Sequence, residues 1–262
     1  MSNEALYPVP PNFSDAHITP EKYHDMYRQS LEDPETFWSQ QASDFLSWDK
    51  TWDLVCESDL SIGHARWFDG GKLNASVNCI DRHLPARAEQ TAILWEGDDP
   101  GVSQHITYQM LKDEVCRLAN VMHDRGVRAG DRVCIYMPMV PEAAYAMLAC
   151  TRIGAIHSVV FGGFSPEALK DRINDASCRM VITADEGLRG GKKVPLKTNV
   201  DAALADCPSV DTVIVLERTG APIDWANGRD ISYGASTRAA SSDFEPVSMD
   251  SEAPLFILYT SG

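Results

Sequence analysis

Long apolar runs are missing from this 262-residue sequence, in which no stretch approaches the roughly 18 apolar residues that a membrane-spanning helix needs. The first residues, Met1-Ser2-Asn3-Glu4, also lack the basic and apolar regions of a secretory signal peptide. From these two absences we expect a cytoplasmic protein that has no membrane partner.

Clustered cysteines are missing as well. The seven cysteines are dispersed, and even the closest two, Cys134 and Cys150, lie sixteen positions apart. This spacing excludes a local Cys-x-x-Cys site, and the odd count argues against a disulfide framework, so we expect a reducing compartment. The seven histidines are equally scattered and predict no local metal site, although a metal site built from residues distant along the chain stays open.

Basic residues are few, with 23 Lys and Arg against 38 Asp and Glu, which gives a formal net charge of −15. Nucleic-acid and anionic-membrane surfaces need a basic stripe, so we expect neither partner. The acidity is typical of a soluble protein. The length predicts one or two domains with a substantial core.

Aromatic residues are abundant near the N-terminus. The tryptophans of this part are Trp38, Trp48, Trp52 and Trp67. Helices are expected to begin at Thr19-Pro20-Glu21 and Asp33-Pro34-Glu35, where a capping residue precedes a proline and an acid. We predict that residues 1–85 form an aromatic-rich, helical region that wraps onto a neighbouring domain.

From residue 86 to residue 262, apolar strands alternate with helices. The predicted strands are Ala92–Trp95, Arg132–Met137, Ile156–Phe161, Met180–Thr183, Val213–Leu216 and Leu255–Tyr259. The predicted helices begin after Thr107, at Pro141, after Ser165 and at Pro195, and residues 218–250 are expected to be irregular. This alternation predicts an α/β fold, in which a mostly parallel sheet buries its strands under helices on both faces.

A basic loop follows the predicted strand at Met180–Thr183. Between Leu188 and Val200 there are basic residues and no acid, and the loop begins with Arg189-Gly190-Gly191-Lys192. Paired glycines let a backbone approach a ligand, and arginine offers a bidentate fork to phosphate. The alternative interpretation is a solvated loop that leads into a helix.

Two further loops share this edge of the predicted sheet. Phe161-Gly162-Gly163-Phe164-Ser165 has glycines that expose helix N-terminal amides and aromatics that would flank a flat ring, or it is a tight connection with a serine cap. Thr260-Ser261-Gly262 suits a phosphate, or it is an ordinary turn. Together the three loops predict a polyphosphorylated ligand.

Three other candidates have simpler interpretations. Asp81-Arg82-His83 could suggest acid–base catalysis, but adjacent residues of a helix do not share a face, which favours ion pairing and capping. His157 is expected to lie within its strand and to be satisfied by a neighbour, and Tyr259 is expected to lie in the core.

Several of these motifs occur together in one known family. They are Trp67–Asn74, Asp81–His83, Val159–Ser165, Ala184–Lys192 and Leu258–Gly262. With them, nearly the whole chain resembles the N-terminal part of the AMP-forming acetyl-CoA synthetases, within the acyl-adenylate-forming superfamily. The resemblance implies that a carboxylate attacks the α-phosphorus of ATP to give an acyl-adenylate, from which the CoA thiolate displaces AMP, with Mg²⁺ assisting.

The resemblance also implies roles for the three loops. Thr260, Ser261 and Gly262 would open the cradle for the ATP pyrophosphate. The nucleotide part of CoA would bind Arg189, Gly190, Gly191, Lys192, Phe161, Gly162 and Gly163. Relatives often carry arginine at the position of Lys192; lysine keeps the charge but loses the bidentate fork.

The family's phosphate loop continues beyond the position of Gly262, and its acyl pocket and catalytic lysine lie further on. The resemblance therefore implies an N-terminal part, ending within the phosphate loop, that is inactive alone and holds no catalytic residue and no metal ligand. Two alternatives remain open: a propionate or other short-chain acyl-CoA ligase, and a non-catalytic CoA-binding module. The expected partners are acetate, ATP and CoA, and the resemblance is compatible with a homo-oligomer.

Overall fold

The first two long helices begin at the capped prolines that the sequence predicts. The computed structural model describes residues 7, 9–13 and 15–260, and within it α1 (Pro20–Glu32) and α2 (Pro34–Phe45) follow a short 3-10 helix, η1 (Pro11–Phe13). The Thr19 hydroxyl accepts the Lys22 N–H at 3.3 Å, and an Asp33 carboxylate oxygen accepts the Thr36 N–H at 3.3 Å. Both caps satisfy amides that have no partner inside the helix.

The chain divides into two compact units, and the first consists of Met1–Leu46 and Leu54–Trp67. It contains α1, α2 and the two-stranded sheet of β1 (Leu54–Asp59) and β2 (His64–Asp69), whose last two residues fall in the second unit. The indole of Trp38 packs edge-on against the rings of Phe37 and Trp67, at centroid distances of 5.0 and 5.8 Å. Aromatic contacts thus replace a larger aliphatic core in this unit.

The second unit consists of Ser47–Asp53 and Phe68–Gly262, and it begins with its own aromatic cluster. The rings of Trp48, Trp52 and Phe68 lie 4.9 to 5.5 Å apart. After the cluster come β3 (Lys72–Leu73), α3 (Ala75–Cys79), the 3-10 helix η2 (Asp81–His83) and α4 (Leu84–Arg87).

A six-stranded sheet formed by described residues is the centre of this unit. Its spatial order is β12-β11-β8-β6-β7-β14, and every neighbouring pair is parallel. The strands are β6 (Arg132–Tyr136), β7 (Ile156–Val159), β8 (Met180–Ala184), β11 (Thr212–Leu216), β12 (Asp230–Ser232) and β14 (Phe256–Ile257). The predicted parallel sheet is therefore confirmed.

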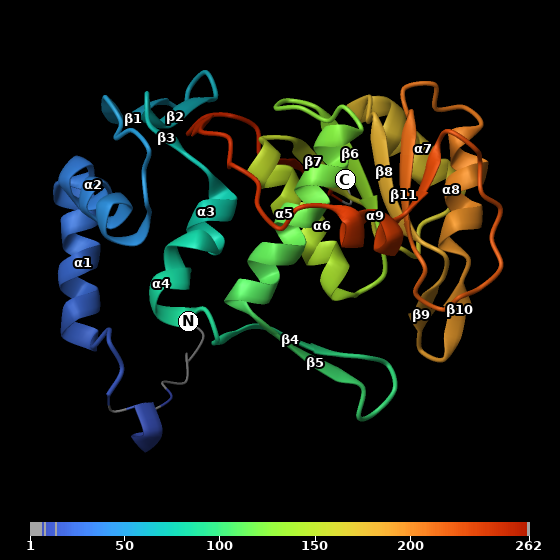
Figure 1. The fold of residues 1–262 in the computed structure, drawn as a ribbon. Helices are drawn as coiled ribbons and strands as arrows, with labels where there is room; N and C mark the ends of the chain where they lie inside the picture. Colours follow the sequence, from blue (N-terminus) through green and yellow to red (C-terminus); the bar gives the residue numbers. More distant parts are fainter. Residues whose placement is uncertain (1–6, 8, 14, 261–262) are drawn as a thin grey trace, which may run out of the picture. The chain divides into compact units, whose positions relative to one another are not determined.

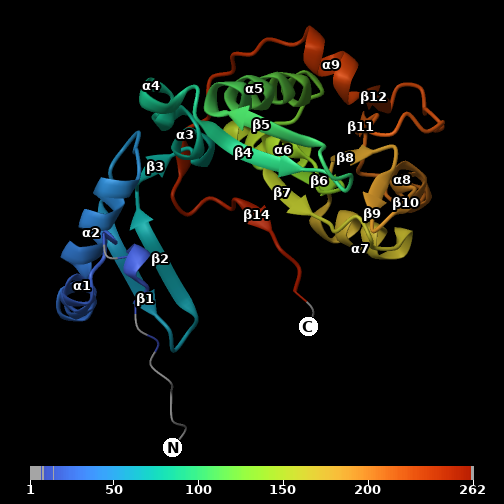
Figure 2. The ribbon, with the colours of Figure 1, turned by 90° about the horizontal axis from the view of Figure 1, so that it is seen from below.

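Helices cover both faces of this sheet, as predicted (Figures 1 and 2). Along β6, Val133 and Ile135 join a core with α5 (Tyr108–Asp124), α6 (Pro141–Ile153) and Tyr233 of α9 (Tyr233–Ala239). Cys134 and Tyr136 point into a second core with α7 (Pro166–Ala176) and α8 (Leu196–Leu204). Because neighbouring residues of a strand face opposite sides, a continuously apolar strand serves two cores.

The predicted helix starts at Pro141 and after Thr107 and Ser165 are confirmed, whereas α8 begins at Leu196, one residue after the predicted Pro195. Thr107 caps α5, Ser165 caps α7, and Gly154 ends α6 in the left-handed conformation at φ 80°. A glycine at this position ends a helix without the steric cost that a Cβ would add.

Two predictions about the arrangement of the second unit are wrong. The strand predicted at Ala92–Trp95 is β4 (Thr91–Glu96), but it pairs antiparallel with β5 (Ser103–Thr107) in a sheet of its own. Residues 218–250, expected to be irregular, contain β12, α9 and β13 (Met249–Asp250), which pairs with β3. These elements are too short to produce a periodic apolar pattern.

The last strand is present but exposed, whereas a buried strand was predicted. Phe256 is 53 % exposed and Leu258 is 68 % exposed, because β14 pairs with β7 on one side and the described residues place no strand on the other.

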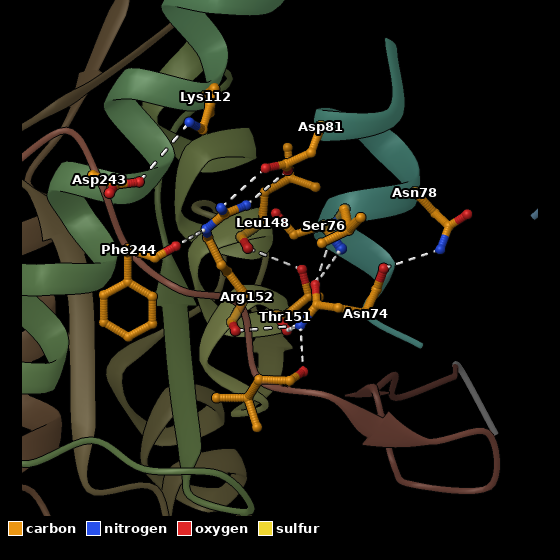
Figure 3. A network of polar contacts seen from close by, with 12 residues as sticks. Asn74, Ser76, Asn78, Asp81, Lys112, Leu148, Thr151, Arg152, Asp243 and Phe244 are labelled. Atoms are coloured by element: carbon orange, nitrogen blue, oxygen red, sulfur yellow. Dashed lines mark hydrogen bonds and ion pairs between the residues drawn. The ribbon is translucent and has the colours of Figure 1, made fainter. Parts of the chain in front are cut away.

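A buried polar network joins α3 and η2 to the end of α6 (Figure 3). Arg152 is 2 % exposed and donates to both carboxylate oxygens of Asp81, at 2.8 and 3.1 Å, and to the Phe244 carbonyl at 2.9 Å. The Asn74 amide donates to the Thr151 carbonyl at 2.9 Å. Asp81 thus has the ion-pairing role that the sequence favours, since a buried guanidinium needs a paired carboxylate.

Candidate functional site

The direction of the chain connections reverses between β6 and β8. The connection after β6 runs through α6 to β7 on one side, and the connection after β8 runs through α8 to β11 on the other side. Open parallel sheets bind ligands at such a reversal, in the crevice outside the carboxyl ends of the strands. The topology therefore points to the segments that follow β6, β7 and β8.

These segments line one cavity of about 190 Å³. The lining residues are Asp98, Met137, Pro138, Met139, Phe161, Gly162, Gly163, Gly187, Leu188, Arg189, Gly190, Val194 and Leu196. The cavity thus brings together Gly162, Gly163 and Gly190, which come from two glycine pairs that lie 27 or more positions apart along the chain. Of the seven residues predicted to bind CoA, Gly191 and Lys192 are not among those that line it.

The predicted basic loop is a β-hairpin. Its strands are β9 (Gly187–Arg189) and β10 (Lys192–Val194), and its two turn residues, Gly190 and Gly191, have φ values of 54° and 73°. A two-residue turn with both φ angles positive matches the twist of the flanking strands and favours glycine at both positions. The conformation of the turn is therefore sufficient to account for the presence of glycine at both Gly190 and Gly191.

Arg189 and Lys192 are directly opposite each other in the hairpin. Cross-strand partners project from the same face, and like charges in this arrangement destabilise a hairpin. Among the described residues, neither side chain has an ion-pair partner within 4.0 Å. This pair of cations is suited to an anion.

The turn after β7 contacts the hairpin through an aromatic ring. The guanidinium carbon of Arg189 lies 4.8 Å from the ring centroid of Phe161, within the range of a cation–π contact. A Cβ added to Gly163 would lie 2.6 Å from that ring and 3.1 Å from an Arg189 nitrogen, so the glycine permits this close packing.

The two phenylalanines of this turn do not form a clamp for a flat ring. Phe161 and Phe164 meet edge-on, with an interplanar angle of 84° and centroids 5.9 Å apart. The edge-on packing offers no two parallel faces for a flat ring in this conformation, and the flanking of a ring by these aromatics stays a prediction. The Tyr136 hydroxyl donates to the Phe164 carbonyl at 2.8 Å and thereby fixes the turn from the core side.

Two basic residues of the predicted loop are already paired with acids. Lys193 lies 3.0 Å from Glu186, and this contact together with a hydrogen bond from Thr219 lowers the pKa of the Glu186 carboxyl. Lys197 is 1 % exposed and contacts Asp201 at 2.7 Å and Asp230 at 2.9 Å. The cationic face of the hairpin is thus confined to Arg189 and Lys192.

A buried carboxylate fixes the base of the hairpin. Asp185 is 1 % exposed and follows β8 directly. It accepts backbone N–H groups at 2.6 to 3.3 Å, which belong to Glu186, Arg218, Thr219, Gly220 and Ala221. Charge-assisted bonds of this kind hold two neighbouring loops rigidly at the same edge of the sheet.

Of the residues predicted to hold the ATP phosphates, the structure describes Thr260, which is exposed beyond β14. Ser261 and Gly262 lie outside the described residues. Because β14 and β7 are parallel neighbours, Thr260 leaves the same sheet edge as the Phe161 turn. Within residues 7, 9–13 and 15–260 there is no group of three or more His, Cys, Asp or Glu side chains arranged for a metal ion.

Two simpler predictions about single residues are wrong. His157 is 8 % exposed, but its Nδ1 has no hydrogen-bond partner in the described part of the chain, and burial lowers its pKa to about 4. Tyr259 is half-buried and not in the core, and its hydroxyl donates to Asp175 at 2.5 Å.

The sequence reasoning missed part of the cavity. Met137, Pro138 and Met139 follow β6 and could have been identified from their place at the end of a buried strand. Asp98 could not, because it belongs to the β4–β5 hairpin, which reaches this edge through a hydrogen bond from the Trp95 indole to the Met139 carbonyl at 2.8 Å.

Family models place the chain in a known class. The model of the AMP-binding enzymes matches residues 80–262, and the model of the acetyl-coenzyme A synthetase N-terminus matches residues 23–79. The chain belongs to the AMP-binding enzyme family.

Relatives and a solved structure refine this assignment. The chain is 60% identical over its whole length to an acetyl-coenzyme A synthetase of Saccharophagus degradans, and 64% identical over 94% of its length to acetyl-coenzyme A synthetase 2 of Pseudomonas putida. It covers 41% and 38% of these proteins, so it spans about two fifths of the relatives that it matches. The acetoacetyl-CoA synthetase from Streptomyces lividans superposes with a TM-score of 0.83 at 25% identity, over 95% of this chain and 38% of that one.

None of the helices formed by the described residues is both long and apolar enough to cross a membrane.

Proposed function

We propose that this chain supplies part of the CoA site and the start of the ATP phosphate site of an AMP-forming acetate–CoA ligase. The observation that carries the proposal is the one cavity lined both by the Phe161-Gly162-Gly163 turn and by Arg189 and Gly190 of the hairpin, with the Arg189 guanidinium against the Phe161 ring. Acetate is proposed over other short acids because relatives at 60% identity and above are named acetyl-coenzyme A synthetase.

In this proposal, Arg189 and Lys192 bind the phosphates at the nucleotide end of CoA. Charge-assisted hydrogen bonds to phosphate are strong, and arginine makes them bidentate. The bound anion also relieves the repulsion between the two facing cations, so the free hairpin is prepared for it. The aromatic and aliphatic lining of the cavity takes the less polar part of the ligand.

The Thr260 hydroxyl would donate a hydrogen bond to an ATP phosphate, and Ser261 and Gly262 would belong to the same phosphate site. ATP brings a Mg²⁺ ion, which prefers phosphate oxygens and water and needs at most one or two carboxylates. The proposed compartment is the cytoplasm, and the division into residues 1–85 and 86–262 stays a prediction.

Calorimetric titration tests the pocket directly. CoA is expected to bind about ten-fold more tightly than 3′-dephospho-CoA, the magnitude of one good charge-assisted bond. Arg189→Ala is expected to erase this difference. The matched control is Lys193→Ala, which removes a neighbouring cation that is already paired with Glu186, and this variant is expected to keep the difference. Equal binding of the two ligands by the unaltered protein would remove the hairpin from the proposed site.

A further inference from the structure

Arg172 of α7 connects two segments that leave neighbouring strands. Its guanidinium carbon lies 4.6 Å from the ring centroid of Phe164, in the turn after β7, and 5.1 Å from that of Tyr259, in the segment after β14. Both distances are within the range of cation–π contacts. Among the described residues Arg172 makes no ion pair within 4.0 Å, so its charge is directed at the two rings.

The same helix also holds Tyr259 by a hydrogen bond. The Tyr259 hydroxyl donates to a carboxylate oxygen of Asp175, three residues after Arg172. Burial, and then this bond to Asp175, raise the pKa of Tyr259 to about 12, so the hydroxyl remains a donor at neutral pH. Tyr259 is thus held at its ring by Arg172 and at its hydroxyl by Asp175.

The orientation of Arg172 is fixed within its helix. One guanidinium nitrogen donates to the Ala168 carbonyl at 2.9 Å, one turn earlier in α7. The helix itself begins at the Ser165 cap, directly after Phe164, whose carbonyl is held by Tyr136. The guanidinium is therefore carried by a rigid element, and a group held in this way can position what it touches.

We propose that Arg172 is a positioning residue that joins the Phe161–Phe164 turn to the Tyr259–Thr260 segment, so that the CoA pocket and the ATP phosphate residues keep one fixed spacing. Arg172 and Asp175 are called the α7 clip here. The inference rests on the proposed function, because the turn lines the proposed CoA pocket and Thr260 opens the proposed phosphate site.

The clip has a specific consequence for the two ligands. A residue that binds one ligand affects the affinity for that ligand, as expected of Arg189 and CoA. A residue that fixes the spacing of two segments affects both affinities, because each segment loses the partner that orders it. At a partly exposed site, loss of the two cation–π contacts corresponds to a change of about five-fold in affinity.

The test compares variants in the complete natural protein that carries this chain, with the KM for CoA and the KM for ATP measured separately at saturating acetate. Arg172→Met is expected to raise both KM values about five-fold. Arg172→Lys keeps a cation without the flat guanidinium, so its KM values are expected to lie between those of the unaltered protein and those of Arg172→Met. The matched control is Lys170→Met on the same helix, because Lys170 contacts Asp206 and neither ring. This control is expected to change neither KM.

The outcomes separate the clip from the proposed pocket. If Arg172→Met changes only one of the two KM values or neither, the proposed role of the α7 clip is overturned. A variant that lowers only the melting temperature or only kcat overturns it as well. If Arg189→Ala leaves the KM for CoA unchanged, the pocket assignment fails, whatever Arg172→Met shows. Should Arg172→Met not fold, Arg172→Lys decides: a rise of about two-fold in both KM values supports the clip, and unchanged values overturn it.

Discussion

Within the described part of the chain, His157 is buried without a hydrogen-bond partner for one of its ring nitrogens. It lies in β7, next to β14, and its ring centroid is 5.7 Å from that of Phe256. Burial disfavours the protonated imidazole and lowers the pKa from 6.5 to about 4. The packing between these two strands therefore requires the imidazole to be neutral.

This histidine predicts a pH dependence of stability. Because the pKa is lower in the folded state, the unfolded state binds the proton more readily. The contribution of His157 is then complete above pH 6.5 and is lost as the pH falls towards about 4. Between pH 7 and pH 5 the loss of this contribution lowers the free energy of unfolding by about 2 kcal/mol.

Urea denaturation of the unaltered protein and of His157→Gln at both pH values measures this contribution, since the carboxylates titrate equally in both proteins. The variant is expected to lose about 2 kcal/mol less than the unaltered protein between pH 7 and pH 5. Equal losses would mean that His157 is protonated in the folded protein at pH 5.

At the same scale, the sequence predicts which residues belong to the candidate site better than it predicts their contacts. The glycine pairs and Arg189 were predictable because each follows an apolar strand, and the carboxyl ends of parallel strands share one edge. The edge-on packing of Phe161 against Phe164 and the burial of Lys197 were not predictable. Both result from packing between segments that are distant along the chain.

The end of α6 and strand β13 depend on each other at the scale of elements. Gly154 ends α6 with a φ of 80°, and a Cβ added there would lie 2.5 Å from the Met249 sulfur of β13 and 3.2 Å from the Ala129 methyl carbon. The glycine therefore meets two requirements at once, a left-handed backbone and the close approach of another strand.

Gly154→Ala is expected to destabilise the protein by about 2–4 kcal/mol, from backbone strain and from overpacking against Met249. The matched control is Gly228→Ala, at a φ of 83° and with no atom of the described residues within 4 Å of the added Cβ, for which about 1 kcal/mol is expected. Urea midpoints measure both changes. A loss at Gly154 no larger than that at Gly228 would show that Met249 moves away without cost.

Elements were predictable from the sequence where they are long and capped. The starts of α1, α2, α5 and α7 follow from Thr19, Asp33, Thr107 and Ser165, each of which satisfies a free amide of its helix. The pairing of β4 with β5 was not predictable from the strand pattern, because a half-buried strand has the same pattern of apolar and polar residues in a parallel sheet and in a hairpin. Short elements such as β12 gave no periodic signal.

At the scale of the whole molecule, the two units differ in how much apolar surface they bury. Among the described residues of the first unit, α1 has no buried residue, and the buried apolar side chains are Phe37, Ala42 and Val55. In the second unit, every residue of β8 is buried between the two cores. Because burial is the main stabilising contribution, the two units are expected to open with different free energies.

Native-state hydrogen exchange distinguishes these openings residue by residue. Amides of α1 are expected to exchange at least about a hundred-fold faster than those of α5, because a local opening that exposes little apolar surface costs several kcal/mol less than global unfolding. Helix α5 is the matched control, since it is also a capped, amphipathic helix but contributes seven buried residues, among them Val115 and Leu118. Protection of α1 equal to that of α5 would contradict the prediction, because it would require the first unit to open only when the two cores of the second unit unfold.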